Sequence, residues 1–177
     1  MKRRVPLITI LFILIHICSY AQRAVVSTDV LKWTVATPNI NVDVLLTDRF
    51  TAAIELSANP FEKMYGELYT KHLSISPEVK YWFKRPIYSH YLGANFLYSM
   101  FNVGYKDYRE CGDIVALGIT YGYSIYLNQR WSLTPSVGGG VGFLNSGSVE
   151  DGQYQPTQRS IKPVVTKLGI SISYLID

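Results

Sequence analysis

Bulky apolar residues alternate with small ones along ALGITYGYSIYLNQRWSLTPSVGGGVGF, residues Ala116 to Phe143. In the first half, Leu117, Ile119 and Tyr121 occupy odd positions, and the positions between them are mainly Gly, Ser and Thr. Successive side chains of a β-strand point to opposite faces of a sheet, so this spacing predicts strands rather than helices. One face of these strands is apolar, and the other carries only small residues. This pattern restricts the chain to a sheet in which the second face has little room for side chains.

The same alternation recurs along the chain. Further segments with period-two apolar positions are Ile40–Leu46, Phe50–Leu56, Leu73–Phe83, Leu92–Met100 and Leu168–Tyr174. With a first strand over Val25–Trp33, the pattern predicts eight strands, and no segment has convincing helical periodicity.

The expected connections are short at one end of these strands and long at the other. Tight turns are predicted at Thr47–Arg49, Lys84–Pro86 and Asn128–Arg130, and long loops at Asn59–Lys71, Gly104–Gly112 and Ser146–Ser160. Short turns at one end and long loops at the other are typical of barrels that cross a membrane. The predicted fold is therefore all-β, an eight-stranded antiparallel up-and-down transmembrane β-barrel.

The face that carries Gly, Ser and Thr indicates which side of the sheet points into a confined interior. Strand positions that face water favour polar residues, and Gly weakens a strand unless close approach requires it, so a row of Gly, Ser and Thr fits the interior of a narrow barrel. The strand charges fall on this inward face: Asp43, Glu55, Glu78, Lys80 and Lys167. A Lys or Arg facing lipid at mid-membrane costs about 2–4 kcal/mol. We therefore expect these residues to form a charge network inside the barrel.

The N-terminus has the features of a secretory signal peptide. Lys2, Arg3 and Arg4 precede an apolar stretch over Leu7–Ile15, and Ala21 ends a small-residue cleavage pattern. The sequence predicts a signal peptide over residues 1–21 and an outer-membrane barrel domain over residues 22–177. The apolar run is shorter than the roughly 20 residues of a membrane-spanning helix.

Composition argues against several other functions. Only 17% of residues are charged, compared with about 25% in average soluble domains. Without Lys2, Arg3 and Arg4, 14 basic residues face 13 acidic ones, a net charge of +1 that gives nucleic-acid binding no electrostatic basis. Cys111 is the one cysteine outside the predicted signal peptide, so no disulfide framework or metal-ligand spacing is expected, and no cofactor. Its reactivity is left open.

Aromatic residues and the C-terminus point to a membrane environment. Aromatic side chains flank the predicted strands at both ends, as in the two girdles of a membrane barrel. The segment KLGISISY, Lys167–Tyr174, resembles the final-strand signal of outer-membrane proteins. The expected partners are outer-membrane lipid and the outer-membrane assembly machinery.

Two segments carry a family resemblance. The stretch Ser27–Phe61, with its TPN step and Glu55 before NP, and the segment PEVKYWF at Pro77–Phe83 are similar to a Bacteroidota family of uncharacterised small outer-membrane barrels, a domain of unknown function. The resemblance covers nearly the whole chain after the signal peptide. It implies an eight-stranded barrel of the OmpA and OmpX type, and it implies no activity or catalytic residues.

The predicted long loops hold candidates for recognition. Their aromatic residues lie among charged ones and resemble a binding surface for a surface protein, fibre or polymer; they are Phe61, Tyr65, Tyr69, Tyr105 and Tyr108. The alternative is an interfacial aromatic girdle with solvated loops. The favoured function is a structural, adhesion or surface-assembly role through these loops, not a pore and not an enzyme.

Two other functions remain open. His72 and Ser74 lie on one face of a strand, with Glu67 as a possible orienting acid, and resemble the His and Ser of outer-membrane lipid A deacylases. The parity of the strand points both residues inward, whereas such an enzyme needs them facing lipid. A soluble periplasmic lipid-binding barrel is the third possibility.

Overall fold

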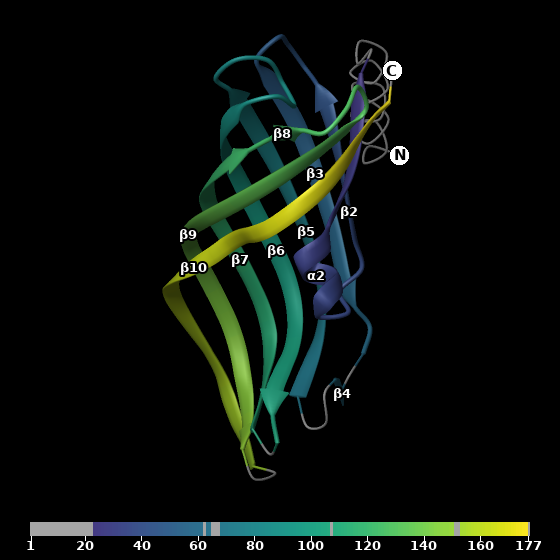
Figure 1. The fold of residues 1–177 in the computed structure, drawn as a ribbon. Helices are drawn as coiled ribbons and strands as arrows, with labels where there is room; N and C mark the ends of the chain where they lie inside the picture. The colour runs from purple at the N-terminus through teal and green to yellow at the C-terminus, as the bar shows by residue number, and fades with distance from the viewer. Residues whose placement is uncertain (1–22, 62, 65–67, 107, 151–152, 177) are drawn as a thin grey trace, which may run out of the picture.

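The structure, a computed structural model, describes residues 23–61, 63–64, 68–106, 108–150 and 153–176. The predicted signal peptide lies outside the described residues. Within them the chain forms one antiparallel sheet and one short helix (Figure 1), which confirms the all-β prediction. The elements are β1 (Ala24–Asp29), α2 (Val30–Thr34), β2 (Asn39–Leu45), β3 (Phe50–Asn59), β4 (Lys63–Met64), β5 (Leu68–Trp82), β6 (His90–Tyr105), β7 (Tyr108–Tyr123), β8 (Ile125–Tyr126), β9 (Trp131–Glu150) and β10 (Gln153–Ile176).

The sheet closes on itself. Its order is β1-β2-β3-β5-β6-β7-β9-β10, and β10 then pairs with β1, from Ala24 opposite Ile176 to Asp29 opposite Ser171. The short β8 pairs with β9 just beyond the end of β7, and β4 pairs with β5. Because each strand of the ring has a neighbour on both sides over at least part of its length, the first and last strands are not left as edges.

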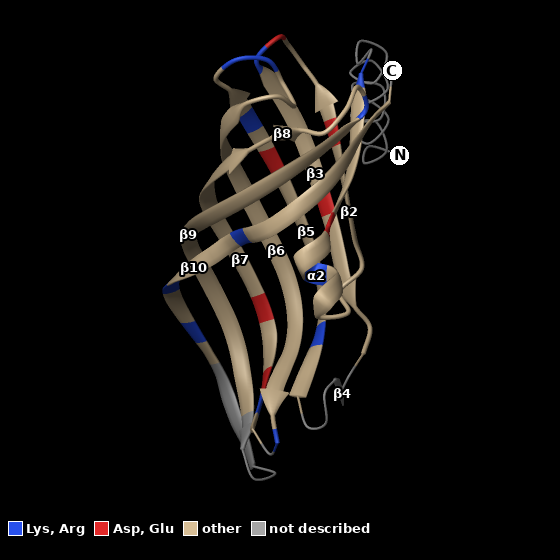
Figure 2. Cartoon of the chain, in the orientation of Figure 1, with Lys and Arg blue, Asp and Glu red and all other residues tan. Residues whose placement is uncertain are grey.

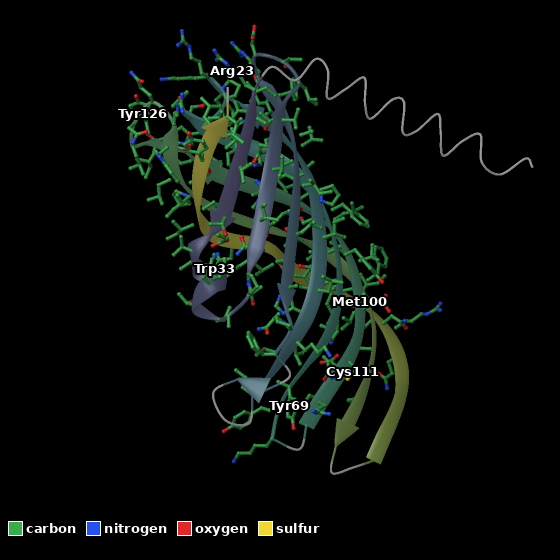
Figure 3. The ribbon with its side chains drawn as sticks, turned by 90° about the vertical axis from the view of Figure 1, so that its right-hand side faces the viewer. Arg23, Trp33, Tyr69, Met100, Cys111 and Tyr126 are labelled. Carbon is green, nitrogen blue, oxygen red and sulfur yellow. The ribbon has the colours of Figure 1, made fainter. Side chains whose placement is uncertain are left out.

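Side chains segregate across the wall as the alternation predicts. On β7 the exposed fractions of Leu117 and Ile119 are 61% and 63%, whereas Ala116 and Thr120 are completely buried. The outer face is thus mainly apolar, and the inner face holds small and polar groups (Figure 3). Lys and Arg gather at the end of the ring where β1 begins and β10 ends, and charges along the strands are sparse (Figure 2).

The first predicted strand ends earlier than expected. β1 stops at Asp29, and Val30–Thr34 form α2, so the prediction of a strand through Trp33 is wrong. The cause is local, because the Asp29 carboxylate caps the helix by accepting the backbone N–H of Leu31 at 2.9 Å. Among the described residues, no helix is both long and apolar enough to cross a membrane.

The predicted long loops are mostly strand. The described parts of the segments Gly104–Gly112 and Ser146–Ser160 continue the ladders of β6 with β7 and of β9 with β10. Long gaps between the alternating segments predicted loops there, but Gly104 serves close strand packing. A Cβ atom at Gly104 would overlap the carbonyl oxygen of Tyr108 and lie 2.8 Å from the Cα of Arg109.

The turn predicted at Lys84–Pro86 is instead part of a loop that folds into the end of the ring. Ile87 is buried against Val25 and Leu175, and Leu45 packs beside them. Its φ of 74° is rare for a β-branched residue and indicates strain of about 1–3 kcal/mol. This apolar cluster closes the end of the ring where β1 begins and β10 ends.

The wall of the ring is taller on one side than on the other. β1 and β2 have 6 and 7 residues, whereas β9 and β10 have 20 and 24. α2 joins the two short strands and packs against β10, and the β9–β10 hairpin extends far beyond it (Figure 1). The far end of the molecule is therefore a set of projecting hairpins rather than a closed ring.

Two adjacent glycines of β9 provide a test of the inner packing. A Cβ atom at Gly140 would overlap the backbone of Leu117 and Gly118, whereas a Cβ atom at Gly139 would come no closer than 3.8 Å to its nearest neighbour, the Val164 carbonyl oxygen. We expect Gly140→Ala to lower the free energy of unfolding by about 1–3 kcal/mol, because the neighbouring backbone must move. Gly139→Ala is the matched control and should be nearly neutral in urea titrations. Equal effects of the two substitutions would contradict the packing described.

Candidate functional site

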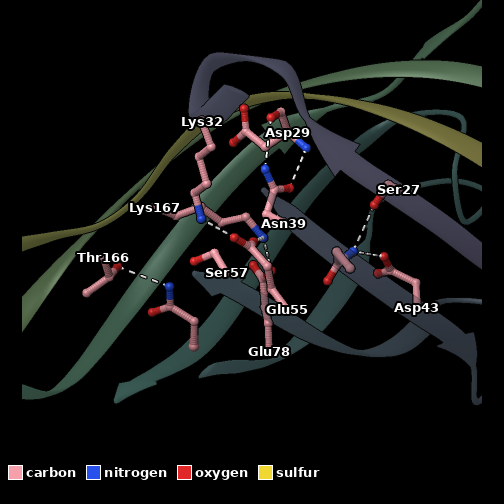
Figure 4. A network of polar contacts seen from close by, with 12 residues as sticks. Ser27, Asp29, Lys32, Asn39, Asp43, Glu55, Ser57, Glu78, Thr166 and Lys167 are labelled. Atoms are coloured by element: carbon pink, nitrogen blue, oxygen red, sulfur yellow. Dashed lines mark hydrogen bonds and ion pairs between the residues drawn. The ribbon is translucent and has the colours of Figure 1, made fainter. Parts of the chain in front are cut away.

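The ring brings together ionisable residues from four strands. Asp43 comes from β2, Glu55 from β3, Glu78 and Lys80 from β5, and Lys167 from β10. Each lies on the inner face, as the parity of its strand indicates. Figure 4 shows Glu55, Glu78 and Lys167 converging inside the ring.

Opposite charges alternate through this cluster. The Nζ atom of Lys167 lies 2.6 Å from a carboxylate oxygen of Glu78 and 3.8 Å from one of Glu55. Lys80 forms an ion pair with Asp43, and its Nζ atom lies 3.9 Å from Glu78. A buried ion without a partner is strongly destabilising, whereas these residues compensate one another. These five residues are three carboxylates and two lysines, so one further cation is needed to balance the interior charge.

Lys32 is a member of the network that the sequence did not indicate. It extends from α2 and pairs with Glu55 (Figure 4). Sequence reasoning placed Lys32 in a strand of ambiguous parity, and only the helix turns it inward. The available signal was Asp29, a residue type that favours a helix N-cap.

A buried polar cluster fixes α2 in place. Asp29 also accepts the backbone N–H of Ile170 on β10 at 3.2 Å, and its own N–H donates to the side chain of Asn39 on β2 at 2.7 Å. A Cβ atom at Gly169 would overlap the Asp29 carboxylate, so a glycine there leaves the space that this carboxylate occupies. The helix is thus anchored to both neighbouring strands while Lys32 reaches the interior.

Polar side chains occupy much of the remaining interior. Asn95 donates to Thr166 at 3.1 Å, and the hydroxyls of Ser57 and Ser74 lie 2.6 Å apart. Toward the end of β5 and the start of β6, the ring of Tyr91 lies 4.9 Å from that of Trp82. A cavity of about 30 Å³ beside these two rings, lined also by Asp43, Lys80 and Lys167, has room for about one water molecule.

Pairs of aromatic rings form a girdle on the outside of the wall, at the end where β1 begins and β10 ends. The ring centroids of Phe50 and Tyr81 lie 5.2 Å apart, and those of Trp131 and Tyr174 lie 5.0 Å apart. Two arginines bond to this girdle, because Arg49 donates to the Tyr81 hydroxyl at 3.2 Å and Arg130 to the Tyr174 hydroxyl at 3.0 Å. On the same face, His90 hydrogen bonds to the hydroxyl of Tyr121 at 2.5 Å.

The predicted recognition residues lie on hairpins and do not form one surface. Tyr105 and Tyr108 are directly paired at the end of β6 and β7 and share a face. Tyr69 lies in the adjacent row, so it points to the opposite face, where Arg109 stacks 3.7 Å above its ring. Phe61 is exposed near the end of β3. Tyr65 lies outside the described residues.

The residues of the possible hydrolase have other partners. A ring nitrogen of His72 lies 2.9 Å from the carbonyl oxygen of Thr70, and Ser74 is bonded to Ser57 on β3. Glu67, the possible orienting acid, lies outside the described residues. Cys111 is exposed on β7.

Comparison with known protein families gives one match. A family model described as a protein of unknown function, DUF3575, matches residues 7–176. The chain belongs to this family. Neither the comparison with curated proteins nor that with solved structures gave a match.

The interior network predicts a large effect of removing one cation. Lys80→Met leaves Asp43 and Glu78 short of positive charge inside the ring, so we expect a loss of about 3–5 kcal/mol in the free energy of unfolding. The control Lys84→Met alters an exposed loop residue and should change stability by less than about 0.5 kcal/mol. Adding Asp43→Asn to Lys80→Met should recover part of the loss. The network would be refuted if urea titrations found Lys80→Met no more harmful than Lys84→Met.

Proposed function

We propose that this chain is an eight-stranded outer-membrane β-barrel that does not form a pore and that presents its projecting hairpins to a partner at the cell surface. The observation that carries the proposal is the segregation of the wall. Apolar side chains cover the outside of the ring, and ion-paired residues occupy the inside. In water such an arrangement would expose a large apolar surface, whereas in a bilayer it places each group in a favourable environment.

The dimensions of the apolar belt support this proposal. On and just beyond β5 the outward apolar residues run from Leu73 to Phe83. Ten residue steps correspond to about 33 Å along a strand, or roughly 25 Å of height at a tilt of about 40°. That height matches the apolar band of outer-membrane barrels.

The outward residues of neighbouring strands become polar toward the hairpin ends. A single cross-strand row of outward residues is apolar or aromatic throughout: Ile75, Tyr98, Val115, Phe143 and Ile161. Two rows further toward the hairpin ends, Lys71, Asn102 and Cys111 lie side by side. A change from apolar to polar outward residues along several neighbouring strands is expected where a wall leaves a membrane.

The interior supports a role other than transport. A ring of about eight strands has an interior just wide enough for side chains. Here the ion pairs cross it, and the apolar cluster around Ile87 covers one end. We therefore assign the function to the hairpins beyond the belt, in an adhesive, structural or surface-assembly role.

A gel-mobility experiment tests the membrane assignment. We expect the unboiled protein from the outer-membrane fraction to migrate differently from the boiled protein, because a closed ring has no free edge from which to unravel. Val26→Pro removes a backbone donor from β1, which is paired on both sides, and should abolish the mobility shift, whereas Val26→Ile should retain it. Release of the protein by osmotic shock without detergent would count against the proposal.

Crosslinking on intact cells tests the role of the hairpins. Replacing both Tyr105 and Tyr108 with Ser should remove the exposed aromatic pair at the end of β6 and β7 and abolish crosslinks to a surface partner. Tyr126→Ser, an exposed tyrosine at the opposite end (Figure 3), is the matched control and should leave them intact. An unchanged crosslinking profile, or lipid deacylation that is lost on Ser74→Ala, would shift the assignment to the lipid-modifying enzyme.

A further inference from the structure

A groove crosses the outside of the wall where the apolar belt ends. It has a volume of about 960 Å³ including its open side, and it extends over β7, β9 and β10. Its lining includes Asp113, Val115, Phe143, Asn145, Arg159 and Ile161. All six have the outward parity of their strands, so the groove opens away from the interior network.

The six residues form two parallel rows. Val115, Phe143 and Ile161 are cross-strand neighbours in one row, and Phe143 and Ile161 have exposed fractions of 53% and 67%. The second row lies one pair closer to the hairpin ends and consists of Asp113, Asn145 and Arg159. The groove is therefore amphipathic along the direction of the strands, with its polar half beyond the belt.

The polar row has charges of opposite sign at its two ends. The amide of Asn145 donates to one oxygen of Asp113 at 3.2 Å, and Arg159 is exposed at the other end. Among the described residues, no ion pair joins Arg159 to a carboxylate. Since β9 separates β7 from β10, the backbones that carry the two charges are about 10 Å apart. Such a row complements a ligand that itself carries a cation and an anion.

We propose that this groove binds one phospholipid with a zwitterionic headgroup. Arg159 holds the phosphate, Asp113 holds the ammonium group, and an acyl chain runs from the headgroup along the strand direction, across the row of Val115, Phe143 and Ile161. The apolar row lies next to the charged row, on the side away from the hairpin ends. It favours a lipid over a soluble zwitterion, because burial of the acyl chain accompanies binding of the headgroup. The inference rests on the proposed membrane function, since it needs the belt to lie in a bilayer.

Lipid retention tests the site. The full-length exported protein is purified in detergent, incubated with equal amounts of phosphatidylethanolamine and phosphatidylglycerol, and examined by native mass spectrometry. We expect the unaltered protein to retain phosphatidylethanolamine preferentially, and Arg159→Gln to reduce that retention roughly tenfold through loss of a charge-assisted hydrogen bond. Asp113→Asn should shift the preference toward phosphatidylglycerol. Lys71→Gln, which removes an outward cation on β5 outside the groove, should change neither.

The outcomes separate this inference from the membrane assignment. If Arg159→Gln and Asp113→Asn bind both lipids as the unaltered protein does, while all variants keep the heat-dependent mobility shift, the lipid site is refuted and the barrel stands. If the unaltered protein has no mobility shift and does not associate with vesicles, the membrane function itself has failed. Arg159→Lys, which keeps the charge, should recover most of the phosphatidylethanolamine binding, and its failure to do so would contradict the assigned role of Arg159.

Discussion

Pairing of the first strand with the last is the constraint on which the rest of the structure depends. Once β1 joins β10, the wall has an inside, and the inside of so narrow a ring accepts little bulk. The Gly, Ser and Thr rows of β7 and β9 follow from this closure, because β7 and β9 approach each other closely at Leu117 and Gly140. The outer face has no such limit and carries the large apolar side chains.

Charged residues can be buried inside the closed ring because each lysine there lies beside carboxylates of opposite charge. Lys167 lies between Glu55 and Glu78, and Lys80 lies between Asp43 and Glu78. Glu55 also pairs with Lys32, which lies on the helix α2 and not on a strand of the sheet. The helix that carries Lys32 is anchored by Asp29 to β10, so the network connects the short side of the wall to its tall side.

The features that could be predicted from the sequence were those with a fixed period. Alternation alone placed Leu117 outside and Thr120 inside, and it gave Asp43 and Lys80 their inward parity. Features that depend on a distant partner were not predictable in this way. The turn at Asp29 needs Asn39 and Ile170, the inward fold of Ile87 needs Val25 and Leu175, and the glycines near the hairpin ends resemble loop residues until a neighbouring strand approaches them.

The register between Ala24 and Ile176 has a consequence for how the chain folds. Ala24 and Ile176 are far apart in the sequence, so ring closure requires a contact of very large sequence separation. Contacts of this kind form slowly. Until β10 is in place, β1 has an unpaired edge, and the apolar side chains of the outer face are not yet held by a closed sheet. Partly folded chains of this kind aggregate readily. We therefore expect chaperones to shield this chain from aggregation until β1 and β10 have paired.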